Sequence, residues 1–67
     1  MTEKERSLLQ AWLLAEETRI YNELVERRNF IRFHDLDVVD CMEMMLILQR
    51  LQDFREFSRI LVQLLHL

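Results

Sequence analysis

Residue types that can hold a metal ion cluster near the middle of the chain. His34, Asp35, Asp37 and Asp40 combine an imidazole with three carboxylates, and hard divalent ions need several such oxygens. The spacing matches no EF-hand loop, and the glycine that such a loop requires is missing. Asp is also a preferred residue at the start of a helix. We therefore expect helix caps and solvated charges here, and we predict no metal and no cofactor.

The single cysteine, Cys41, follows this cluster. A thiol near a helix N-terminus can be a nucleophile, but the carboxylates of Asp37 and Asp40 oppose that, and the nearest base is His34, seven residues earlier. We expect a small buried apolar residue instead and predict that the protein is not an enzyme. An unpaired cysteine fits a reducing compartment, and the sequence shows neither a signal-peptide pattern nor a membrane-length apolar run. A cytoplasmic location is therefore expected.

A third group could contact nucleic acid. Arginines position phosphates, and aromatic rings can stack on unpaired bases. The candidate residues are Arg27, Arg28, Arg32, Phe30 and Phe33. Acidic residues precede and follow this group, and the net charge of the chain is −3. A nucleic-acid-binding regulator is therefore the alternative interpretation, and ion pairs near a helix C-terminus are the one we favour.

The elements that must position these residues are helices. The chain of 67 residues has no glycine and no proline, which removes the usual sources of tight turns and kinks. Hairpins of β strands need such turns, and phosphate-binding loops need glycine. The predicted fold class is all-α, with one domain over residues 1–67.

The first helix is expected over about residues 3–31. Thr2 and Glu5 have the spacing of a capping box. The apolar stripe that follows consists of Leu9, Leu13, Ile20, Leu24 and Ile31, widened by Leu14, Tyr21 and Val25. The C-terminal boundary stays open: Asn29 could take the left-handed cap position, or the helix could continue to about Phe33.

A turn is expected at about 32–36 and a second helix at about 37–65, with Asp37 or Asp35 as its N-cap. Apolar residues step along it by 3 and 4, as in a coiled-coil seam. The seam consists of Met44, Ile47, Leu51, Phe54, Ser58, Leu61 and Leu65, broadened by Phe57, Ile60 and Leu64. The two helices should form an antiparallel hairpin held by Leu13, Ile20, Leu24, Ile47, Leu51, Phe54 and Leu61. One long helix or a swapped dimer with an open hinge is the alternative.

The start of the second helix is apolar nearly all round. From Cys41 to Leu48 there is one charge in eight residues, so this segment must be covered on more than one side. The first helix can cover only one side. Helical periodicity places Trp12 opposite the Leu13 stripe, and a tryptophan in that position is a candidate anchor of an interface. The expected dimer or partner interface is Trp12, Cys41, Met42, Met45 and Leu48.

A chain this short, without disulfides or a metal, gains stability most simply from oligomerisation. We expect a homodimeric four-helix bundle. In size and layout the chain resembles the Rop family of small RNA-binding hairpin dimers, with Leu36-Asp37 followed by Asp40-Cys41 as the local pattern. The resemblance concerns architecture, since the outer face of the first helix carries Glu16, Glu23 and Glu26. The function expected is protein–protein interaction, as a regulator, adaptor or assembly chaperone.

Overall fold

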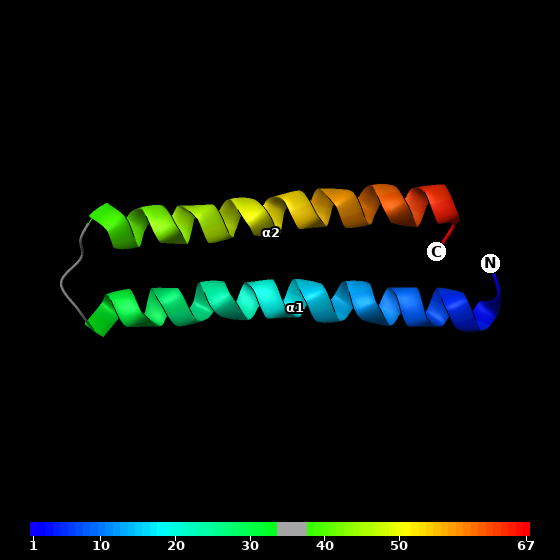
Figure 1. Ribbon diagram of the computed structural model, residues 1–67, viewed down its shortest axis with the longest axis horizontal. Helices are drawn as coiled ribbons and strands as arrows, with labels where there is room; N and C mark the ends of the chain where they lie inside the picture. The colour runs from blue at the N-terminus through cyan, green and yellow to red at the C-terminus, as the bar shows by residue number, and fades with distance from the viewer. Residues whose placement is uncertain (34–37) are drawn as a thin grey trace.

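The computed structural model contains two long helices, α1 (Glu3–Phe33) and α2 (Val38–Leu65). It describes the backbone of residues 1–33 and 38–67, and the side chains of residues 1–30 and 41–67. The helices lie side by side and run in opposite directions, so the two termini share one end (Figure 1). We call this the terminal end, and the end with Phe33 and Val38 the link end. Within the described residues the fold is all-α, as predicted.

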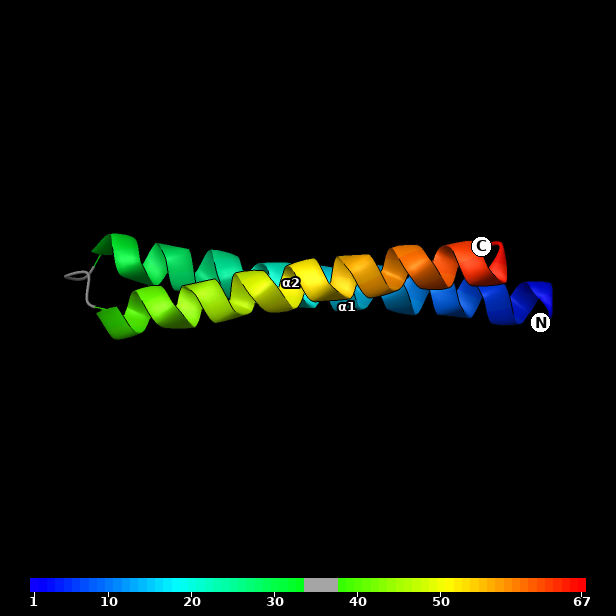
Figure 2. The same ribbon diagram turned by 90° about the horizontal axis from the view of Figure 1, so that it is seen from above.

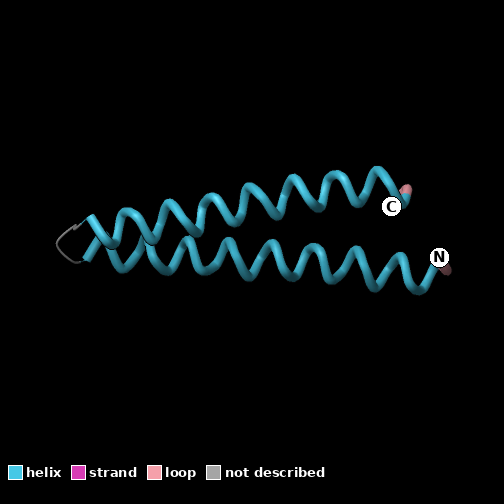
Figure 3. The backbone as a smooth tube through the Cα atoms, turned by 45° about the horizontal axis from the view of Figure 1, so that its top comes forward, coloured by secondary structure: helices cyan, strands magenta, loops and turns pink. Residues whose placement is uncertain are grey.

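The hairpin is long and thin, with extents of 50 × 17 × 10 Å. Seen from above, the two helices cross at a shallow angle (Figure 2). Figure 3 draws α1 and α2 alongside each other, and among the described residues no further helix or strand covers the pair. Each helix can therefore bury only the stripe that faces its neighbour.

The start of α1 has the predicted capping box. The Glu5 backbone N–H donates to Thr2 Oγ1 at 3.1 Å, and the Thr2 backbone N–H donates to Glu5 Oε1 at 3.0 Å. These two bonds satisfy donors that no helical carbonyl can reach. This prediction is confirmed.

The end of α1 differs from the expected turn at 32–36, because residues 32 and 33 are still helical. Asn29 lies inside the helix and does not take a left-handed conformation. Its helix propensity is lower than that of alanine by only about 0.7 kcal/mol, which is too little to end a helix with no glycine or proline nearby. The proposed caps of α2, Asp35 and Asp37, lie outside the described residues.

The end of α2 closes with a Schellman motif that the sequence did not reveal. His66 has a φ of 54°, and the Leu67 backbone N–H donates to the Val62 carbonyl at 3.0 Å. Glycine normally takes this left-handed position. In a chain without glycine, a histidine takes it instead.

The predicted seam is where the helices meet. Leu13, Ile20 and Leu51 are the buried hydrophobic residues among those described, and the other described seam positions of both helices are half-buried. The expected broadening is wrong for most of its residues. Leu14, Tyr21, Phe57, Ile60 and Leu64 are all exposed, whereas Val25 is half-buried. A two-helix hairpin has no second layer to cover these flanking positions.

Candidate interaction surface

One side of the hairpin has an apolar hollow between the helices in the link half. Tyr21, Val25 and Arg28 lie one turn apart along α1 and form one wall. Met45 and Leu48 of α2 form the other wall, with Leu24 and Met44 at the floor. Met45 is 67% exposed although it stands beside the core. We call this side the groove face.

The apolar surface continues from the groove face around the back of α2. Met42, Met45, Leu46 and Gln49 line a second shallow hollow there. Leu46 is 68% exposed and Met42 is also exposed. Met45 belongs to both hollows, so the two join in one continuous surface. The nearly all-round apolar segment of the sequence is therefore uncovered on two sides.

Near the middle of the hairpin, the groove face becomes more polar. Glu17, Thr18 and Arg55 line a hollow there, together with Leu14 and Tyr21. Arg55 Nε donates to Glu17 Oε1 at 2.7 Å, which joins the two helices. The groove face thus has an apolar link half and an ion pair near its middle.

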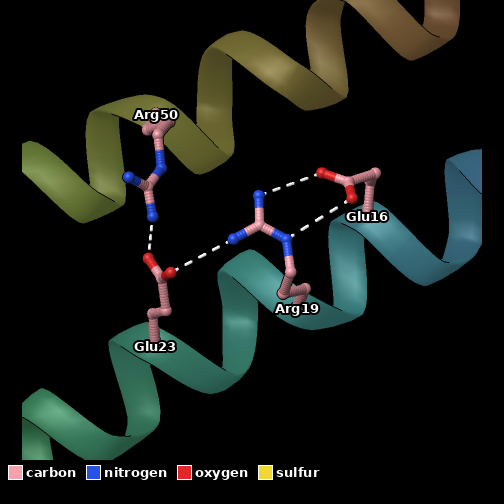
Figure 4. Close-up of polar contacts among 4 residues, drawn as sticks. All are labelled: Glu16, Arg19, Glu23 and Arg50. Atoms are coloured by element: carbon pink, nitrogen blue, oxygen red, sulfur yellow. Dashed lines mark hydrogen bonds and ion pairs between the residues drawn. The ribbon is translucent and has the colours of Figure 1, made fainter.

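The opposite side, which we call the ion-pair face, is charged from its link half to the middle of the hairpin. Figure 4 shows a chain of four residues there. Arg50 of α2 pairs with Glu23 of α1, Glu23 accepts from Arg19 Nη1 at 3.2 Å, and Arg19 Nη2 donates to Glu16 at 3.0 Å. Both carboxylates of this row, Glu16 and Glu23, are therefore paired with arginines of the same polypeptide.

These ion pairs shift the ionisation of their exposed members. The hydrogen bond from Arg19 lowers the pKa of Glu16, and the same contact raises the pKa of Arg19. Likewise, Glu56 raises the pKa of Arg59, whose Nη2 lies 2.5 Å from Glu56 Oε1. Arg19 and Arg59 are exposed and Glu16 is half-buried, and the largest cause of each shift is the hydrogen bond between the partners.

The terminal half of the ion-pair face is aromatic. The rings of Trp12 and Phe54 meet edge to face with centroids 6.0 Å apart, and Phe57 lies 6.1 Å from Phe54. We call these three residues the aromatic patch. Sequence analysis placed Trp12 opposite the seam, which is wrong, because its ring packs against α2. Trp12 contacts Phe54 of the other helix, and half of its surface stays exposed.

The predicted interface residues therefore do not form one surface. Met42, Met45 and Leu48 lie on the link half of α2, and half-buried Cys41 stands one turn before Met45. Trp12 lies at the other end of the hairpin on the ion-pair face, in line with Glu16 one turn later. Sequence reasoning missed the α1 wall of the groove. Its signal was present in Tyr21 and Val25, which had been assigned to a wider seam.

Two residues of the basic group of the nucleic-acid alternative, Arg27 and Phe30, make contacts within the chain. Arg27 pairs with Glu43 at 2.6 Å, and its guanidinium lies 5.8 Å from the centroid of Phe30. Arg28 lies at the groove. The side chains of Arg32 and Phe33 lie outside the described residues. Arg55 and Arg59, which could have extended a basic strip, pair with Glu17 and Glu56.

The predicted metal-type cluster also lies outside the described side chains, since it spans residues 34–40. Among the described residues, no group of three or more His, Cys, Asp or Glu side chains is placed to hold a metal ion. Over the same part of the chain, neither helix is long and apolar enough to cross a membrane.

Comparison with known proteins gives no match to a family model, to a curated protein or to a solved structure.

Proposed function

We propose that this chain is a small protein–protein interaction module that pairs with a second copy of itself to form a four-helix bundle. Its role is binding and not catalysis. The pair then presents its remaining exposed surface, including the aromatic patch, to another protein as a regulator, adaptor or assembly chaperone does.

The observation that carries this proposal is the amount of exposed surface. The single chain exposes 5441 Å², whereas a folded monomer of 8.3 kDa is expected to expose about 4,600 Å². The excess is close to the roughly 800 Å² that each partner buries in a standard protein interface. Pairing of two copies would therefore bring the exposed surface of each chain to that of an ordinary folded protein.

The kind of surface supports the same proposal. Soluble monomers rarely leave large contiguous apolar patches exposed. Here Met42, Met45, Leu46 and Leu48 are all exposed on less than two turns of α2. Thioether side chains adapt to irregular partner surfaces, which suits a contact between helices.

Gel filtration with light scattering tests the proposal. We expect a mass near twice 8.3 kDa at micromolar concentration, whereas the mass of a single chain would refute self-association. Met45→Glu should dissociate or unfold the dimer, because it places a charge on the apolar surface. Asn22→Glu is the matched control, since Asn22 is exposed on α1 away from the groove walls.

A further inference from the structure

The groove face changes character along its length, and this restricts how two copies can meet on it. Its link half is the apolar hollow between Tyr21, Val25, Met45 and Leu48. The Glu17–Arg55 ion pair lies near the middle of the hairpin. A partner that covers this part of the face must be apolar at the link end and charged near the middle.

A second copy meets this requirement in only one of the two twofold arrangements that pair the groove faces. If the link ends lie together, apolar half meets apolar half. If the link ends lie at opposite ends and the hairpins overlap fully, each helix faces its own copy, and Glu17 of one copy lies near Glu17 of the other. The second arrangement would therefore place like charges side by side, which is costly, and would separate the two apolar link halves.

The charges support the first arrangement. With the twofold axis parallel to the helices, α1 of one copy lies beside α2 of the other, antiparallel and at the same height. Glu17 of one copy then lies level with Arg55 of the second copy, as it does with its own Arg55. The acidic and basic partners of the single chain are thus repeated across the interface.

We infer that two copies associate through their groove faces with their link ends at the same end of the bundle. This inference rests on the self-association proposed above. It specifies the surface used, the partner and the relative direction of the two hairpins.

Thiol cross-linking tests the direction, because Cys41 lies at the link end and is the only cysteine. In the same-end arrangement the two Cys41 side chains lie at one end of the bundle, and a short bismaleimide should join them. In a fully overlapped opposite-end arrangement they stand about 30 Å apart at 1.5 Å per residue, so no such product should form.

A second variant applies the same cross-linking test at the terminal end of the hairpin. Cys41→Ser combined with Gln63→Cys moves the sole thiol to an exposed site on α2 near the terminal end. Each protein alone should give a cross-linked dimer, and an equimolar mixture should give no product that joins Cys41 to the introduced thiol. Mass spectrometry of the cross-linked peptides identifies the products.

The outcomes separate the two proposals. A monomer by light scattering contradicts the proposed function itself. Two results overturn the same-end arrangement and leave self-association intact. One is a cross-link between Cys41 of one copy and the thiol at position 63 of the other. The second is a dimer in which neither the Cys41–Cys41 product nor the product joining the two thiols at position 63 forms. Products that join only like positions support the same-end arrangement.

Discussion

The two faces of the hairpin differ in where their apolar and charged residues lie. On the groove face the link half is apolar and the Glu17–Arg55 pair lies near the middle. On the ion-pair face the link half holds Arg50–Glu23 and Arg27–Glu43, and the terminal half holds the aromatic patch. The buried seam of Leu13, Ile20 and Leu51 lies between the two faces.

The faces differ in how far the chain satisfies its own groups. The carboxylates and guanidinium groups named on the ion-pair face have partners within the chain, and Trp12 and Phe54 pack on one another. On the groove face, Met45 and Leu48 line a hollow that none of the described side chains fills. The face that carries unfilled apolar surface is therefore the one expected to need a partner.

The largest expected effect comes from the seam that both faces share. Leu51 is 2% exposed, and Leu51→Ala should cost about 2–5 kcal/mol through lost burial and the cavity it leaves. Urea unfolding followed by circular dichroism at fixed protein concentration measures this. Gln52→Ala, at the adjacent exposed position, should stay within about 0.5 kcal/mol of the natural protein. An equal loss in both variants would show that the seam is misplaced.

Two aromatic truncations test which face of the hairpin mediates self-association. Tyr21→Ala removes a wall of the groove and should weaken self-association about tenfold or more, as loss of an interface aromatic does. Trp12→Ala should instead lower the free energy of unfolding, by about 1 kcal/mol or more from the lost ring contact and burial, and leave the dimer intact. Analytical ultracentrifugation across a dilution series separates the two effects. If Trp12→Ala dissociates the dimer and Tyr21→Ala does not, the faces have been assigned the wrong way round.

The seam and the caps show how much of this fold the sequence predicts. Steps of 3 and 4 located Ile47, Leu51 and Phe54 correctly, because the period of a helix fixes which residues share a side. Thr2 and Glu5 were predictable because a capping box is a local pattern.

The unpredicted features depend on tertiary packing. Whether Tyr21 belongs to the core or to a groove wall is set by how many helices surround it, and periodicity does not give that number. The contact of Trp12 with Phe54 depends in the same way on where the second helix lies. The left-handed His66 has no composition signal, since glycine and asparagine are the usual residues there.

A charge reversal sharpens the contrast between the two sets of ion pairs. Arg55→Glu places two carboxylates at the groove face and should weaken self-association severalfold, and adding Glu17→Arg should restore it. Glu23→Gln on the ion-pair face should lower stability by less than about 1 kcal/mol without changing the dimer. Sedimentation of the three variants at low and high salt is the measurement, and the Arg55→Glu effect should shrink as salt rises. Equal dimerisation of Arg55→Glu and the natural protein would count against charge pairing across the groove face.

The smallest expected effect concerns the ionisation of Glu16. The hydrogen bond and charge of Arg19 lower the pKa of Glu16 below its ordinary value of 4.5, so the charged carboxylate is favoured in the folded state. The stabilisation from this pair is therefore fully present above pH 4.5 and is lost as the pH falls through the lowered pKa. Arg19→Gln should return the pKa of Glu16 toward 4.5, as followed by NMR titration of the carboxyl carbon. Self-association, measured at pH 7, should not change, because the groove face holds none of these groups. A pKa that stays lowered without Arg19 would mean that another donor holds the carboxylate, and the chain of charges on the ion-pair face would need a different order.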